Sequence, residues 1–457
     1  MDDVLTWDAV RSRTALNTRE ISAVELMQAC LARIARDNPT KNAIVSLRDE
    51  DSLLAEAAQA DRAQSDAPLA GLPVAIKDLT NVAGMPTSMG SPAFAGKIAE
   101  ASDITVRRMQ NAGAIVVGKT NTPEFGLGSH TFNPVFGATE NATLSGLSSG
   151  GSSGGAAVAL ACGMVPLADG SDMMGSLRNP AGWNGIYGFR PTWGLVPSEP
   201  VGDMFLHQLS TQGPMARSPR DIALLLDVQA GHDARQPFWF HHDPLAEMLK
   251  TDVSGRRLAW LGDWGGAYPM AEGVLTVCEA GLSRLEDAGC TIEVVPPPFP
   301  AAAIWEAWTT LRSWAVAASL GPLYHQPGTR DLLKPEAIWE ITRGAQLTGA
   351  EIQQASALRS DWYRAAAQLF TQFDAFILPT AQCFPFPIDW HWPKAIGGVT
   401  MDSYHRWMEV VVPVSLIGLP SVALPLSGSR PMGLQIAGPR GDDLAILQIA
   451  EHWHRGS

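Results

Sequence analysis

A lysine and a few serines in this 457-residue chain have the types and settings that nucleophilic catalysis needs. Lys77 ends the apolar run "PVAIK", which is typical of a buried strand. Burial lowers the pKa of a lysine, and a neutral amine can take a proton from a serine hydroxyl. The alternative for a lone lysine is an ordinary solvated position on the surface.

Two of the serines lie in the stretch "SGLSSGGSSGGAAVALACG", at 145–163. Its glycine and serine content is that of a flexible linker. From Ala156 to Cys162, however, no residue is polar, and a helix that is apolar all round belongs in a protein interior. Ser152 or Ser153 would then lie at the N-terminus of this helix, where serine is a preferred cap. We therefore predict a rigid part of a site rather than a linker.

A third segment, "DGSDMMGSLRNPAGWNG", contains Ser176 directly after a glycine. Glycine lets a backbone approach a ligand closely, and a turn of successive N–H groups can bind an anion. Acyl transfer needs such an oxyanion hole. Taken alone, Ser176 could equally be an ordinary turn residue.

Two well-known motifs match the chain but lack the context that they require. "GAIVVGKT" at 113–120 fits the P-loop expression, yet Ala-Ile-Val-Val is strand sequence and not a phosphate-binding loop. "GSSGG" at 151–155 fits the nucleophile elbow, but no strong strand precedes it. The possible bases for that elbow (His405, His452 and His454) lie in no recognisable motif.

Composition excludes several classes of protein. The net charge of −13 argues against a nucleic-acid partner, and no apolar run approaches the length of a membrane span. The N-terminus is acidic and has no signal-peptide core. Five scattered cysteines without CxxC spacing favour a reducing cytoplasm and argue against a zinc site. We therefore expect a cytoplasmic protein without a membrane partner.

Helical and strand patterns alternate along the chain. "ISAVELMQACLARIARDN" carries a capping box of Ser22 and Glu25, and "SDITVRRMQNAGAIVVGKT" reads as a helix, a glycine stop and a strand. Such alternation predicts an α/β layer fold with a parallel or mixed sheet. No repeat and no convincing domain linker interrupts it.

Taken together, these segments resemble the amidase signature family of serine hydrolases. The resemblance runs through "GLPVAIKDLTNVAGMPTSMGS", "AGAIVVGKTNTPEFG", "GGSSGGAAVALACG", "GSDMMGSLRNPA", "GLPSVALPL" and "MGLQIAGPRGDD". It implies a single domain over 1–457, with a signature core at about 60–200 and a variable substrate-pocket region at about 230–400. The implied fold is a central mixed, mostly parallel β-sheet covered by helices on both faces.

The resemblance also implies a Ser–cisSer–Lys triad. Ser176 matches the nucleophile, Ser152 the bridging serine on a cis peptide, and Lys77 the general base. The backbone N–H groups of Met173, Met174, Gly175 and Ser176 match the oxyanion hole. Ser153, Ser171, Asp172 and Arg178 match supporting positions. No metal and no organic cofactor is expected.

One departure from the family pattern concerns this oxyanion loop. Met174 stands where the family usually has the first of two glycines, and we expect its side chain to form an apolar wall beside the substrate. Only the backbone N–H groups have to reach the oxyanion, so the triad is not put in doubt.

The expected substrate is a bulky or aryl carboxamide, because the chain has 15 tryptophans and 15 methionines and many tryptophans fall in the variable region. Phe125, Leu127, Phe132, Trp305 and Trp308 are candidate pocket residues. Four alternatives stay open: a carbamate (urethane) hydrolase, an ester hydrolase, the amidase subunit of a tRNA-dependent amidotransferase, and an inactive ligand-binding relative. A monomer and a homodimer are both compatible with the sequence.

Overall fold

An eleven-stranded sheet forms the centre of the computed structural model, which describes residues 2–426, 428 and 430–456. The strand order is β1-β3-β2-β6-β8-β7-β14-β15-β11-β9-β10. The strands are β1 (Ile44–Leu47), β2 (Pro73–Lys77), β3 (Ile115–Thr120), β6 (Leu167–Asp172), β7 (Tyr187–Arg190), β8 (Thr211–Ala216), β9 (Arg257–Trp260), β10 (Thr291–Val294), β11 (Ala375–Pro379), β14 (Ser421–Leu426) and β15 (Met432–Ala437). Two small hairpins, β4–β5 (Phe132–Asn133, Gly137–Ala138) and β12–β13 (Ala395–Ile396, Val399–Thr400), lie outside this sheet.

The sheet is mixed, and the predicted α/β class is confirmed. Its parallel pairs form two groups, β3-β2-β6 and β11-β9-β10. The pairs from β6 through β8, β7, β14 and β15 to β11 are antiparallel, as is the edge pair β1-β3. The alternation of helices and strands did not reveal this antiparallel middle, because β14 and β15 follow each other directly and β8 returns beside β6.

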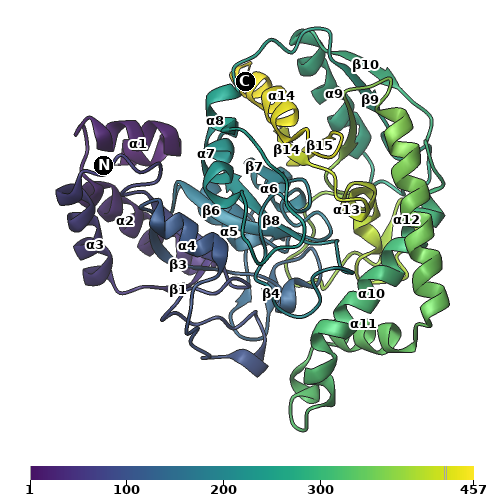
Figure 1. The fold of residues 1–457 in the computed structure, drawn as a ribbon, viewed down its shortest axis with the longest axis horizontal. Helices are drawn as coiled ribbons and strands as arrows, with labels where there is room; N and C mark the ends of the chain where they lie inside the picture. Colours follow the sequence, from purple (N-terminus) through teal and green to yellow (C-terminus); the bar gives the residue numbers. More distant parts are fainter. Residues whose placement is uncertain (1, 427, 429, 457) are drawn as a thin grey trace.

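Helices cover both faces of the sheet (Figure 1). They are α1 (Ala9–Asn17), α2 (Ala23–Lys41), α3 (Glu50–Ala63), α4 (Ile104–Asn111), α5 (Gly154–Ala161), α6 (Asn179–Asn184), α7 (Pro219–Gln229), α8 (Leu245–Met248), α9 (Val274–Asp287), α10 (Ala301–His325), α11 (Pro335–Gln346), α12 (Gly349–Leu369), α13 (Val412–Leu416) and α14 (Asp443–Arg455). Short 3-10 turns include η3 (Glu124–Gly126) and η5 (Arg406–Val411).

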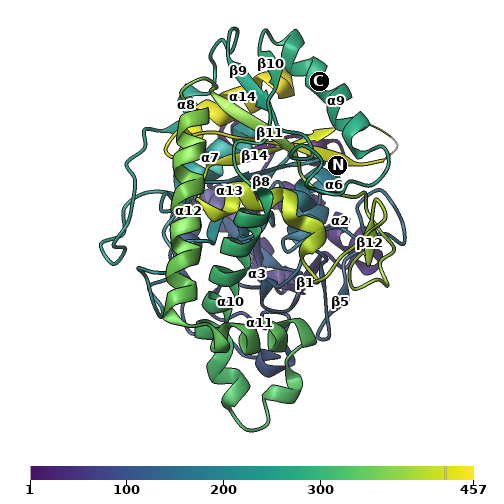
Figure 2. The same ribbon diagram turned by 90° about the vertical axis from the view of Figure 1, so that its right-hand side faces the viewer.

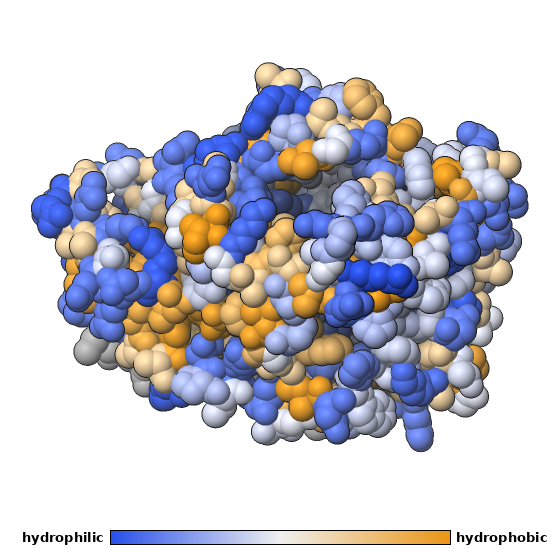
Figure 3. Space-filling model, turned by 90° about the horizontal axis from the view of Figure 1, so that it is seen from below, coloured by the Kyte–Doolittle hydropathy of each residue, from blue (hydrophilic) through white to orange (hydrophobic). Residues whose placement is uncertain are grey.

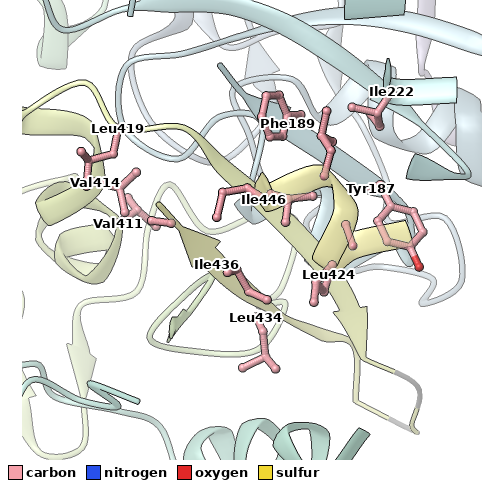
Figure 4. Packing of buried hydrophobic residues seen from close by; sticks show 14 of the residues in the cluster. Tyr187, Phe189, Ile222, Val411, Val414, Leu419, Leu424, Leu434, Ile436 and Ile446 are labelled. Carbon is pink, nitrogen blue, oxygen red and sulfur yellow. The ribbon is translucent and has the colours of Figure 1, made fainter. Parts of the chain in front are cut away.

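The two faces of the sheet belong to different hydrophobic clusters. Ala75 packs in the cluster that contains α5, whereas Val74 and Ile76 belong to the larger cluster that contains α7 and α14. Figure 4 shows this second layer, in which Leu424 of β14 and Ile446 of α14 are labelled. Because side chains alternate along a strand, Lys77 lies on the same face as Ala75, toward α5.

Helix α5 is the buried apolar helix that the sequence predicts. Every side chain from Ala156 to Leu160 is fully buried, and Ser153 is the N-cap residue. The preceding glycines and serines therefore join a packed core, and the alternative of a flexible linker is wrong. The predicted strand in place of a P-loop is also confirmed, since 115–120 form β3.

Helices α1, α2 and α3 lie at one end of the molecule, and α10, α11 and α12 lie at the opposite end (Figures 1 and 2). The predicted capping box of Ser22 and Glu25 is present at the start of α2. Seen from below, the surface carries patches of hydrophobic residues among hydrophilic ones (Figure 3). Across the described residues, no helix combines the length and apolarity that crossing a membrane requires.

A substitution in α5 tests how tightly this helix is packed. A Cβ atom at Gly155 would lie 2.3 Å from the backbone nitrogen of Asn121 and 2.6 Å from the carbonyl oxygen of Ala43. Backbone atoms cannot move aside cheaply, so we expect Gly155→Ala to reduce the free energy of unfolding by about 1–3 kcal/mol. Denaturant unfolding followed by circular dichroism measures this change.

Gly349→Ala is the matched control, because Gly349 also lies in a helix and nothing is within 4 Å of its added Cβ. This variant is expected to stay within about 0.5 kcal/mol of the wild type. Equal effects of the two substitutions would contradict the tight packing of α5.

Candidate active site

The amine of Lys77 is surrounded by three serine hydroxyls. Its Nζ lies 2.8 Å from Ser152 Oγ, 2.9 Å from Ser153 Oγ and 3.1 Å from Ser171 Oγ. Lys77 is the last residue of β2, and its side chain has no exposed surface. The structure therefore brings together the lysine and three of the serines that the sequence singled out.

Burial lowers the pKa of Lys77 to about 7, although the nearby carboxylates of Asp169 and Asp172 oppose this shift. The desolvation of the ammonium form outweighs their attraction. A substantial fraction of the amine is therefore neutral near pH 7 and able to accept a proton.

Asp169 is a second buried ionisable group beside this lysine, and sequence reasoning missed it. Its Oδ1 accepts a hydrogen bond of 2.6 Å from the backbone N–H of Lys77. Burial raises the pKa of Asp169 to about 7. No local pattern marks it, because its strand, "LADGSD", contains two further polar residues, Ser171 and Asp172.

Ser152 follows a cis peptide bond, Gly151–Ser152, at the entrance to α5. The neighbouring loop is held by two polar side chains that the sequence analysis did not identify. Thr131 Oγ1 donates to the carbonyl oxygen of Gly150 (2.8 Å) and accepts from the N–H of Gly154 (3.1 Å). Asn179 Oδ1 accepts from the N–H of Gly151 (3.1 Å). These bonds hold the backbone on both sides of Ser152.

Ser176 lies in the turn between β6 and α6, and 5% of its surface is exposed. Its hydroxyl makes no hydrogen bond to any residue that the structure describes, so Ser152 and Ser176 are not hydrogen-bonded to each other. Hydrogen bonds of catalytic groups are often long in empty sites and shorten when substrate binds. Of the two contacts expected in the triad, the hydrogen bond between Lys77 and Ser152 is thus present, whereas the one between Ser152 and Ser176 is not.

One of the four N–H groups predicted for the oxyanion hole has an acceptor within the turn itself. Gly175 has a φ of +78°, and its N–H donates to Asp172 Oδ1 at 2.9 Å. This N–H is therefore engaged inside the turn, and here the prediction is corrected. The N–H groups of Met173, Met174 and Ser176 remain predicted oxyanion donors.

A buried cluster of three charged side chains, Asp172, Arg178 and Arg190, holds this turn. Arg178 donates to both carboxylate oxygens of Asp172 at 3.0 Å, and Arg190 Nη1 donates to Oδ1 at 3.1 Å. Burial would raise the pKa of Asp172, but the two guanidinium groups outweigh it and hold that pKa well below its usual range. The predicted Asp172–Arg178 pair is present. Arg190 was missed, although it ends an apolar strand just as Lys77 does.

The predicted pocket residues fall into two groups. Phe125 and Leu127 flank Gly126, whose added Cβ would lie 3.4 Å from Ser152 Oγ, so they border the site. Trp308 is buried under the guanidinium of Arg312. Of the other two, Trp305 packs on His405 and Arg406, and Phe132 packs on His130 and His391.

The three histidines considered as bases for an elbow do not serve that role. His405 stacks on Tyr404, His454 contacts Tyr187, and neither hydrogen-bonds to a serine of the site. His452 lies in α14, away from the turn. No cluster of His, Cys, Asp and Glu suited to a metal ion occurs among the described residues.

Comparison with known proteins identifies the family of this chain. The family model "Amidase" matches residues 25–447. The chain belongs to the amidase family. An acylamidase from Rhodococcus erythropolis is 33% identical over 463 residues, which cover 98% of this chain and 95% of that protein. A bacterial aryl acylamidase of the amidase signature family has a TM-score of 0.91 with 26% identity, over 99% of this chain and 96% of that one.

Relatives of this amidase also include components of an amidotransferase. A glutamyl-tRNA(Gln) amidotransferase subunit from Chloroflexus aurantiacus is 32% identical over 478 residues, which cover 97% of this chain and 95% of that protein. The family match confirms the resemblance drawn from the sequence blocks. The protein is accordingly a hydrolase of amide C–N bonds.

The ion cluster of this amidase can be tested by removing its carboxylate. Asp172→Asn leaves Arg178 and Arg190 buried without a counter-ion, so we expect a loss of about 3–5 kcal/mol in the free energy of unfolding. Denaturant unfolding measures it. Asp361→Asn is the control, because Asp361 pairs with Arg364 on the exposed face of α12 and should cost at most about 1 kcal/mol. A loss in Asp172→Asn no larger than the control would refute the supporting role.

Proposed function

We propose that this amidase cleaves its substrate through an acyl-enzyme on Ser176, with Lys77 as general base and Ser152 as proton relay. The observation that carries this proposal is the contact of 2.8 Å between the buried amine of Lys77 and Ser152 Oγ. An amine with a pKa of about 7 that touches a hydroxyl can accept the proton of that hydroxyl.

The first step moves two protons and forms one bond. Neutral Lys77 takes the hydroxyl proton of Ser152 while Ser152 takes that of Ser176. Ser176 Oγ then attacks the amide carbonyl carbon, and the carbonyl oxygen becomes an oxyanion. The N–H groups of Met173, Met174 and Ser176 stabilise this charge.

The second step breaks the C–N bond. Ser152 gives its proton to the leaving nitrogen and recovers one from the ammonium of Lys77, so the amine departs neutral. Water, deprotonated by the same relay, then attacks the acyl-enzyme and releases a carboxylic acid and free Ser176. Ser153 and Ser171 keep the amine of Lys77 directed at Ser152 throughout.

The proposed substrates are bulky or aryl amides. Support comes from the acylamidase and aryl acylamidase relatives and from the apolar surroundings of the site, in which Phe125 and Leu127 border Gly126. Esters and carbamates could follow the same acyl-enzyme chemistry and remain predictions. The net charge of −13 disfavours a tRNA-dependent role.

Covalent labelling tests the nucleophile. A fluorophosphonate is expected to attach to Ser176 in the folded protein, and peptide mass spectrometry locates the adduct. Ser176→Ala should abolish labelling, whereas Ser145→Ala, an exposed serine of the neighbouring loop, should label like the wild type. An adduct on Ser153 would revive the nucleophile elbow, and no adduct at all would favour an inactive ligand-binding protein.

The pH dependence of the rate tests the base. The pKa of Lys77 is lowered to about 7, and only the neutral amine accepts a proton, so kcat/KM should rise as the pH increases through 7 and level off above it. Lys77→Met should lower kcat by about 10²–10⁴-fold. Lys250→Met, an exposed lysine, should leave the profile unchanged.

The variant Asp169→Asn tests whether the group that titrates in the pH profile is Lys77. The Asp169 carboxylate raises the pKa of Lys77, so its removal should shift the rising limb of the profile to lower pH. If the rise of kcat/KM stays at the same pH in Asp169→Asn, the titration belongs to another group. The same conclusion follows if this rise persists in Lys77→Met.

A further inference from the structure

Arg312 is a buried cation that reaches the turn formed by residues 172–176. It lies on α10, is 3% exposed, and its Nη1 is 3.2 Å from Met173 Sδ. Met173 precedes Ser176 by three residues in the oxyanion turn. Figure 2 shows α10 beside α13 at this side of the molecule, and these two helices are packed together.

The other two nitrogens of Arg312 are fixed by strong acceptors. Its Nε donates to Glu340 Oε1 (2.7 Å), and its Nη2 donates to the hydroxyl oxygen of Tyr404 (2.7 Å). The Tyr404 hydroxyl in turn donates to Glu340 Oε1 (2.8 Å). This closed network leaves the guanidinium one orientation, with Nη1 directed at the turn.

Met173 is a poor partner for that nitrogen. A thioether sulfur is a weak acceptor, whereas guanidinium groups bind carboxylate and carbonyl oxygens strongly. Methionine also has three rotatable bonds, and Met173 is only partly buried, so the sulfur can move aside. A stronger acceptor that reached Arg312 Nη1 would therefore replace the Met173 sulfur.

The local charge favours an anionic or strongly polar acceptor. Glu340 balances Arg312, but Arg343 adds a second positive charge and donates to the hydroxyl of Ser313 (2.9 Å). Among the residues described, Arg343 has no carboxylate within ion-pair distance. Arg312 and Arg343 thus place two positive charges on the packed helices α10 and α11, and the ring of Trp308 lies under the Arg312 guanidinium.

We propose that Arg312 Nη1 donates a hydrogen bond to a second acceptor oxygen of the amide substrate, in place of the Met173 sulfur. The favoured substrates are amides that carry a carboxylate on the part that lies against Met173. This inference rests on the proposed function, since it assigns a substrate class to the same site.

Two matched substrate pairs test the inference in the wild-type protein. Succinyl and isocaproyl para-nitroanilides differ by a carboxylate on the acyl side, and N-acetyl derivatives of para-aminobenzoate and para-isopropylaniline differ by one on the amine side. We expect kcat/KM to favour the carboxylate member of at least one pair by roughly tenfold or more. Equal values within both pairs would overturn the assignment, and this holds even if no Arg312 variant folds.

The variant Arg312→Gln separates binding from a structural role. It should bring the preferred ratio close to one, because kcat/KM should fall more for the carboxylate member than for the neutral member. Arg330→Gln, an exposed arginine near the end of α10, should keep the wild-type ratio. An equal fall for both members of the pair would show that Arg312 only supports the turn.

The two proposals fail in different ways. Hydrolysis of the neutral substrates without a carboxylate preference overturns the role of Arg312 alone. Hydrolysis of no substrate, together with no fluorophosphonate adduct on Ser176, overturns the proposed function and this inference with it.

Discussion

The site depends on one interaction, the contact of the fully buried Lys77 amine with the hydroxyls of Ser152, Ser153 and Ser171. An ammonium ion loses its hydration when it is buried, and hydroxyl dipoles replace only part of it. The protein can lower this cost by releasing the proton. The same burial that would destabilise a charged lysine therefore produces a base that is available near pH 7.

Such a base is useful only if the hydroxyls around it cannot move. Ser153 lies at the N-cap position of a helix that has no exposed side chain from Ala156 to Leu160, and Thr131 holds the glycine loop that leads into this helix. On the other side, Asp172 is clamped by two arginines and in turn holds the N–H of Gly175. These fixed parts of the fold thus surround the turn that carries Ser176, whose hydroxyl makes no hydrogen bond to a described residue.

The sequence predicted the parts of the site that lie in continuous motifs. Lys77, Ser152 and the pair of Asp172 with Arg178 could be found because each lies in a short block with a recognisable pattern. Asp169 and Thr131 act through contacts between segments far apart in the chain, which no local pattern contains. The antiparallel middle of the sheet was missed for the same reason, since strand pairing is decided by the packing of distant elements.

These contacts assign different roles to residues 77–190 and to helix α10. Residues 77 to 190 supply the proposed base, the hydroxyls beside it and the predicted oxyanion turn, and they pack on strands that fix their geometry. Helix α10 reaches that turn through the contact of Arg312 with Met173. Side chains on helices can change without moving the strands. Substrate choice can therefore vary at Arg312 and its neighbours while the proton relay between Lys77 and Ser152 stays intact.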